Sequence, residues 1–134
     1  MIQLDQRFII LVLTSLVNVV LGLVVWRNNR THEVNQRFAT YSVAVAAWGL
    51  SNALVNTYAA SPHGIVWARA AFLSASIIPL SFFLFVSVFP TPTPSPSTLL
   101  TRVFLISALT VAGLSTTPLI ARSTSSLDGV LRVA

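Results

Sequence analysis

The sequence predicts an all-α integral membrane protein, a bundle of about four transmembrane helices. The chain has 134 residues, of which 54% are hydrophobic and only 8% are charged, whereas soluble domains carry about a quarter charged residues. The mean hydropathy is +0.80. Apolar runs recur at about the 20-residue length that an α-helix needs to cross a hydrocarbon core of roughly 30 Å. These observations exclude a water-soluble domain.

The first predicted helix covers residues 8–26, which contain no charged residue and end in Trp26. A secretory signal peptide is the alternative, because a short segment containing Arg7 precedes the apolar run. The run is longer than the roughly 7–15 apolar residues of a signal peptide, and it does not end in small residues. We therefore interpret it as an uncleaved span.

Residues 38–60 and 65–89 predict the second and third spans. The second contains no charged residue, so it lacks the charged face of a soluble helix. In the third, about 30 Å counted back from its end reaches Ala70, which places Arg69 at the bilayer boundary with its side chain extending outward. Pro79 has no backbone N–H, so we expect a kink there that can act as a hinge. The aromatic residues that follow are interpreted as lipid-facing bulk and an interfacial belt: Phe82, Phe83, Phe85 and Phe89.

Residues 90–98 contain four prolines at every second position, which predicts a stiff loop. A ligand for a proline-recognition domain is less favoured, because no basic anchor flanks the prolines. Residues 99–121 predict the fourth span, and residues 1–121 thus form one transmembrane domain. Residues 122–134 are a polar tail, interpreted as a truncated outer loop.

The basic residues orient the chain in the membrane. All eight are arginines near the ends of apolar runs, which is typical of membrane topology and not of nucleic-acid binding. The expected partner is therefore the lipid bilayer, with no nucleic acid. Arg7 precedes the first helix, whereas Arg27, Arg30 and Arg37 follow it. The positive-inside rule then predicts a multi-pass protein of the inner (plasma) membrane with its amino terminus outside.

The sequence offers little catalytic chemistry. It contains no cysteine, and its acidic residues and histidines all fall in predicted termini or loops: Asp5, His32, Glu33, His63 and Asp128. No ligand spacing, nucleophile motif or phosphate-binding loop is present. We expect no enzyme activity, no metal and no cofactor, and we interpret the adjacent His32 and Glu33 as a solvated charge pair.

The second predicted helix carries one polar stripe. Tyr41, Trp48, Asn52 and Asn56 recur at spacings of seven, four and four, so they share a face that points to protein or to a cavity. Two interpretations remain open, a small-molecule site and helix packing in which Asn52 and Asn56 bond to Asn18 or Ser74. Small residues repeat at four-residue spacing, which favours packing: Gly49 with Ala53, Ala71 with Ala75, and Ala108 with Ala112.

Several motifs together resemble a known family. They are Asn35-Gln36-Arg37-Phe38 leading into a helix with a central Trp48, then Trp67-Ala68-Arg69, Pro79 and Phe89-Pro90. This order is similar to the N-terminal seven-transmembrane region of bacterial sensor histidine kinases, over most of residues 8–120 and about four of the seven helices. The resemblance implies an outside amino terminus, two-component signalling, and a cytoplasmic kinase or other output domain in a full-length or partner chain.

The resemblance transfers neither catalysis nor a ligand. The phosphoacceptor and ATP-binding regions are absent from these residues, and Trp48, Arg69 and Pro79 match as scaffold positions. We therefore predict a membrane-embedded sensory input module without its own catalytic domain. The alternatives are a small transporter or channel subunit that forms a homo-oligomer through polar helix faces, and a purely structural membrane partner. A pore needs polar residues on several helices, whereas the stripe lies mainly on one.

Overall fold

Four long helices in chain order make up the part of the chain that the structure describes. The computed structural model describes residues 6–58, 63–89 and 98–117. The helices are α1 (Gln6–Asn28), α2 (Glu33–Thr57), α3 (His63–Val86) and α4 (Thr98–Thr116), and all four are long and apolar enough to cross a membrane. The predicted all-α, four-span class is confirmed, and the chain is a multi-pass membrane protein.

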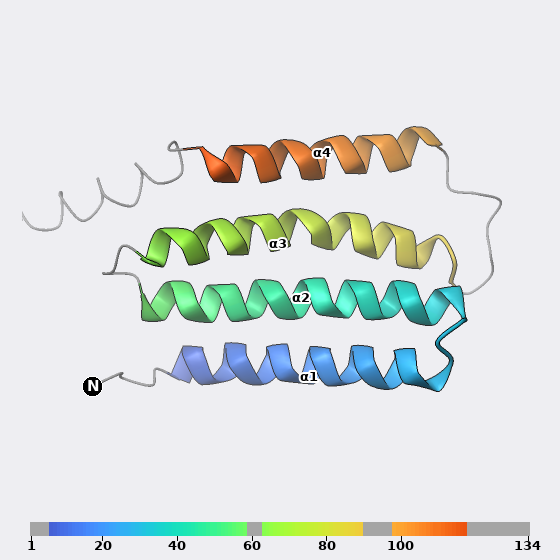
Figure 1. The fold of residues 1–134 in the computed structure, drawn as a ribbon, viewed down its shortest axis with the longest axis horizontal. Helices are drawn as coiled ribbons and strands as arrows, with labels where there is room; N and C mark the ends of the chain where they lie inside the picture. Colours follow the sequence, from blue (N-terminus) through green and yellow to red (C-terminus); the bar gives the residue numbers. More distant parts are fainter. Residues whose placement is uncertain (1–5, 59–62, 90–97, 118–134) are drawn as a thin grey trace, which may run out of the picture.

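The helices lie side by side in a single antiparallel row (Figure 1). α2 packs between α1 and α3, and α4 packs on α3. The end of α1, the start of α2, the end of α3 and the start of α4 all lie at one end of this row. We call it the arginine-rich end, because Arg27, Arg30, Arg37 and Arg102 lie there.

The distribution of side-chain sizes is typical of helices that face hydrocarbon. The buried side chains of the described residues are small, namely Ala44, Ala46, Ala53, Ala71 and five serines. Large apolar side chains point outward instead; Ile10 is 62% exposed and Leu109 is 63% exposed. A soluble protein would bury such residues. In a bilayer, large apolar side chains that face the lipid carry no free-energy penalty. Small residues between the helices let the helices approach closely.

Reciprocal pairs of serine and glycine join α1 to α2. Ser15 of α1 faces Gly49 of α2, and Gly22 of α1 faces Ser42 of α2. A Cβ atom added to Gly49 would lie 2.5 Å from Ser15 Oγ, and one added to Gly22 would lie 3.0 Å from Ser42 Cβ. In both helices serine and glycine are seven residues apart, which is two turns. The helix backbones therefore touch along what we call the Ser–Gly seam.

Aromatic rings join the helices near the arginine-rich end. Phe38 of α2 packs edge-on against Phe85 of α3, with ring centroids 5.6 Å apart, and Phe83 of α3 stacks on Phe104 of α4 at 4.8 Å. The interpretation of these α3 rings as lipid-facing bulk was therefore incomplete. Phe82 is 49% exposed, yet it also packs against a ring of α2. Facing rings fill a helix interface that small residues would leave open.

The helix bounds differ from the predicted spans at their polar ends. α2 begins at Glu33 instead of residue 38, because Arg37 donates to the Glu33 carboxylate at 2.9 Å within the first turns. Glu33 is thus paired with Arg37, not with His32 as predicted. α3 ends at Val86 in a tightened turn before Pro90. α4 ends at Thr116, two residues before Pro118, since proline disfavours helix in the residue preceding it.

Three predicted segments fall wholly or largely outside the described residues. They are the proline-rich loop, the last residues of the predicted fourth span and the polar tail at 122–134.

Candidate functional site

The polar stripe of α2 faces α3 over most of its length. The ring of Tyr41 packs against Phe82 of α3 at a centroid distance of 5.5 Å. Two turns further along, Trp48 and Asn52 line a groove of about 180 Å³ between the two helices. Asn56 is exposed near the end of α2. The structure therefore places three of the four predicted residues at the α2–α3 interface.

The amides of Asn52 and Asn18 bond within their own helices. Asn52 Nδ2 donates to the Trp48 carbonyl at 2.8 Å, and Asn18 Nδ2 donates to the Thr14 carbonyl at 2.9 Å. Ser74 Oγ likewise donates to the Ala70 carbonyl at 2.8 Å. The predicted bridge from Asn52 to Asn18 or Ser74 is wrong. The carbonyl four residues back is always within reach of a short polar side chain, whereas a neighbouring helix must first present its acceptor.

The register along the Ser–Gly seam explains why Asn18 was the wrong partner. Because Ser15 lies beside Gly49 in an antiparallel pair, Asn18 lies beside Ala46. Asn56 is ten residues further along α2, or about 15 Å along the axis. A side-chain hydrogen bond cannot cover that distance.

The α3 wall of the groove is apolar. Ala68, Ala71, Phe72 and Ala75 face Trp48 and Asn52 across it. Polar groups thus lie on one side only, and the volume is smaller than the roughly 300–1,000 Å³ of typical small-molecule sites. The groove suits a loosely packed helix interface better than a large ligand.

Arg69 has a buried atom with unmet hydrogen-bonding capacity. It lies six residues into α3, or about 9 Å from the start of the helix. Its side chain is half-buried, and its Nε is the only side-chain nitrogen or oxygen in the described part of the chain that is buried without a partner. The outward extension of the Arg69 side chain at the bilayer boundary stays a prediction. Leaving a buried donor unpaired costs about 1–3 kcal/mol.

Pro79 lies inside a continuous α3, which is bowed in Figure 1. Serine hydroxyls close to it bond back to the helix backbone. Ser76 Oγ donates to the Leu73 carbonyl at 2.7 Å, and Ser81 Oγ donates to the Ile78 carbonyl at 3.0 Å. Serine side chains of this kind help membrane helices to accommodate proline. A hinge at Pro79 stays a prediction.

A second polar cluster, which sequence reasoning missed, fixes the connection between α1 and α2. Thr31 Oγ1 donates to Asn29 Oδ1 at 2.9 Å, Asn35 Nδ2 donates to the Asn29 carbonyl at 3.2 Å, and Gln36 Nε2 donates to the Arg30 carbonyl at 2.8 Å. The density of amide side chains in residues 28–36 was the available signal, since such side chains commonly satisfy turn backbones.

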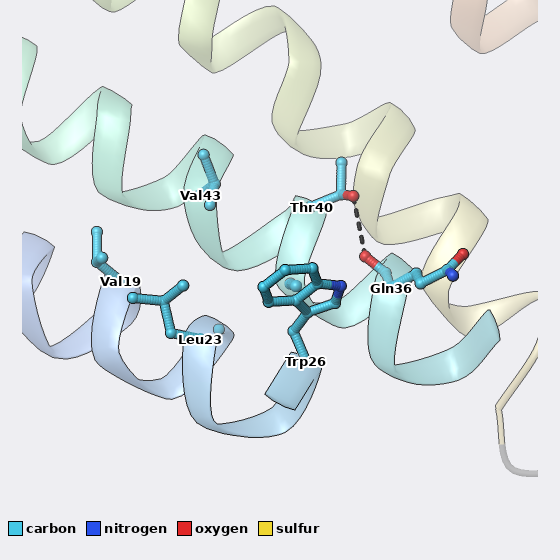
Figure 2. Close-up of a pocket in the computed structure, with 8 residues that line it drawn as sticks. Val19, Leu23, Trp26, Gln36, Thr40 and Val43 are labelled. Atoms are coloured by element: carbon cyan, nitrogen blue, oxygen red, sulfur yellow. Dashed lines mark hydrogen bonds between the residues drawn. The ribbon is translucent and has the colours of Figure 1, made fainter. Parts of the chain in front are cut away.

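An apolar groove of about 430 Å³ lies beside this turn, between α1 and α2. Figure 2 shows Val19 and Leu23 of α1 facing Thr40 and Val43 of α2, with the indole of Trp26 extending between the helices. The guanidinium of Arg30 lies over the Trp26 ring, 4.8 Å from its centroid. The pairing of the two groove walls depends on helix register, so no run of residues in the sequence reveals it.

Within the described residues, no three histidine, aspartate or glutamate side chains are placed to hold a metal ion.

Comparison with known proteins identifies the family. The family model described as the N-terminal 7TM region of histidine kinase matches residues 10–129. A search of curated proteins and a search of solved structures each found no match. Because the match covers nearly the whole chain and reaches all four helices, the chain belongs to the family of N-terminal 7TM regions of histidine kinases.

Proposed function

We propose that this chain is the membrane-embedded sensory input module of a two-component signalling protein, with its amino terminus outside the cell. The observation that carries the proposal is the family match over residues 10–129, together with four helices that can span a membrane. The output, a histidine kinase or another signalling domain, lies in the cytoplasm in the full-length protein or a partner chain. The module has no catalytic domain of its own.

Within this module, the α2–α3 interface is the part that responds to the signal. Trp48 and Asn52 face three alanines and the partly exposed Phe72 across an open groove, so packing leaves room for movement of α3 there. Pro79 weakens the α3 backbone, because it removes one helical hydrogen bond. The unpaired Arg69 Nε gains a hydrogen bond from any acceptor that a signal or another part of the protein brings to it.

The alternative is a small transporter or channel subunit that forms a homo-oligomer through polar helix faces. A conducting path needs polar groups on several of the helices that surround it. The α3 wall of the groove beside Trp48 and Asn52 is alanine and phenylalanine, which supports the sensor over the pore.

The gene itself tests the sensory role. If the chain is the input part of a signalling protein, the reading frame downstream of the Ala134 codon should encode three further apolar segments and then a kinase or other output domain. The expectation follows from the seven spans in the description of the family, set against the four helices described here. A stop codon directly after Ala134, in a chain that co-purifies with no signalling protein, would favour the transporter.

Cysteine labelling tests the orientation. The chain has no natural cysteine, so labelling of a single introduced cysteine is measured without a signal from other thiols of the chain. We expect Asn29→Cys to stay unlabelled when an impermeant thiol reagent is added to intact cells, because the Arg27, Arg30 and Arg37 side chains hold the first loop inside. Ser61→Cys should react. Permeabilised cells give the full labelling of both, and the reverse pattern in intact cells would place the amino terminus in the cytoplasm.

A further inference from the structure

The groove between α1 and α2 has the composition of a lipid-binding surface. Its walls are the α1 residues Val19, Gly22, Leu23 and Trp26 and the α2 residues Gln36, Ala39, Thr40 and Val43. The Thr40 hydroxyl donates to the Gln36 carbonyl at 2.9 Å, so its polarity is already satisfied (Figure 2). The groove therefore presents mainly apolar surface to whatever fills it.

The groove follows the helix axis for about two thirds of the roughly 15 Å hydrocarbon depth of one leaflet. Val19 and Trp26 are seven residues apart on α1, which is about 10 Å. Trp26 lies near the end of α1, at the level where tryptophan usually meets the lipid headgroups. An acyl chain that enters beside Trp26 would thus run into the hydrocarbon alongside Val19.

Positive charge gathers at the mouth of this groove. Arg27 directly follows Trp26, and Arg30 lies four residues after it. The one ion pair among the described residues joins Arg37 to Glu33, so neither Arg27 nor Arg30 has an acidic partner among those residues. Arg30 is also held in place. Its carbonyl accepts from Gln36 Nε2 at 2.8 Å, and its guanidinium stacks over the Trp26 ring.

We propose that the α1–α2 groove binds one acyl chain of an anionic phospholipid whose phosphate contacts the Arg30 guanidinium beside Trp26. The apolar walls take the chain, the ring of Trp26 marks the headgroup level, and the guanidinium supplies charge-assisted hydrogen bonds to the phosphate. An anionic lipid is favoured over a zwitterionic one because the mouth carries arginines that no acidic side chain of the described residues neutralises. The site requires only that lipid surrounds the helices, so it does not depend on the proposed sensory role or orientation.

Fluorescence quenching by brominated lipids tests the site directly. In a chain with Trp48→Phe and Trp67→Phe, Trp26 is the only tryptophan. We reconstitute this chain into phosphatidylcholine vesicles that contain either brominated phosphatidylglycerol or brominated phosphatidylcholine with the same acyl chains. Phosphatidylglycerol should occupy the site at Trp26 with about fivefold preference, which corresponds to about one favourable arginine contact. A chain that keeps only Trp48 reports the surrounding lipid and should show no preference.

Matched arginine variants separate this site from general charge attraction. Arg30→Gln should reduce the preference at Trp26 to about one, because it removes the phosphate contact. Arg102→Gln removes the same charge at the same end of the helix row, from an exposed position on α4, and should keep the preference. An equal loss in both variants, or equal quenching of Trp26 by the two brominated lipids, would overturn the proposal.

A second pair of variants tests the acyl-chain part of the site. Val43→Phe fills the groove and should weaken the quenching of Trp26 by brominated phosphatidylglycerol. Val20→Phe is the control, because Val20 does not line the groove. Its exposure, 56%, matches the 55% of Val43. Circular dichroism verifies that both variants keep their helices. Equal quenching in the two variants, or reversal of the quenching by added inorganic phosphate alone, would contradict a lipid site.

Discussion

Replacing Gly49 with alanine should lower the free energy of unfolding by about 1.5 kcal/mol. The new Cβ would lie 2.5 Å from Ser15 Oγ, which itself donates to the Leu11 carbonyl at 2.8 Å. Either α1 and α2 move apart or Ser15 gives up its hydrogen bond. Overpacking of this kind costs about 2.5 kcal/mol, offset by about 1 kcal/mol of helix propensity gained from alanine. The measurement is unfolding in mixed micelles of rising SDS content, followed by tryptophan fluorescence.

The Ser15→Ala background should abolish this cost. With the Ser15 hydroxyl absent, the nearest atoms to the new Cβ are the Leu11 carbonyl oxygen at 3.7 Å and the residue 15 Cβ at 3.8 Å, which are ordinary contacts. Gly49→Ala should then be neutral or slightly stabilising. Gly113→Ala on α4 is the control, because its Cβ would meet nothing within 4 Å. A destabilisation by Gly49→Ala that is equal in both backgrounds would show that Ser15 does not face Gly49.

The sequence predicted the helices well because each span is determined locally. An apolar run of about 20 residues can satisfy its backbone in a bilayer only as a helix, whatever its neighbours do. The ends were less predictable, because polar residues continue a helix wherever they find local partners. Arg37 and Glu33 extend α2 in this way, while Pro118 follows the end of α4.

Contacts between helices were beyond the sequence, since they depend on register. Gly49 and Ala53 were correctly expected in a close interface, yet their partners on α1 could not be chosen from many small residues. The same ambiguity led to the wrong partner for Asn52. Acceptors on a neighbouring helix compete for its amide with the carbonyl four residues back, and the nearby carbonyl is the one that is bonded. Tyr41, Trp48 and Asn52 of the polar stripe lie at the α2–α3 interface, because helical spacing fixes which residues share a face; their role as a ligand or packing stripe stays a prediction.

A disulfide between Gly22→Cys and Ser42→Cys should form readily in the membrane. The two Cβ atoms would be 3.0 Å apart, a few tenths of an ångström closer than the roughly 3.5–4.5 Å of a relaxed disulfide. A small separation of α1 and α2 removes the difference. Mild oxidation in membranes, followed by denaturation and labelling with a maleimide polymer, measures the cysteines that remain free. The chain has no natural cysteine to interfere.

The control pair is Gly22→Cys with Ser51→Cys. Ser42 and Ser51 are both buried, at 2% and 6% exposure, so reagent access is comparable. Ser51 lies nine residues further along α2, or about 13 Å, which is too far for a disulfide with residue 22. We expect the Ser42 pair to close at least about tenfold faster. Equal rates would mean that α1 slides along α2, and the Ser–Gly seam and the groove beside Trp26 would then both lack a fixed register.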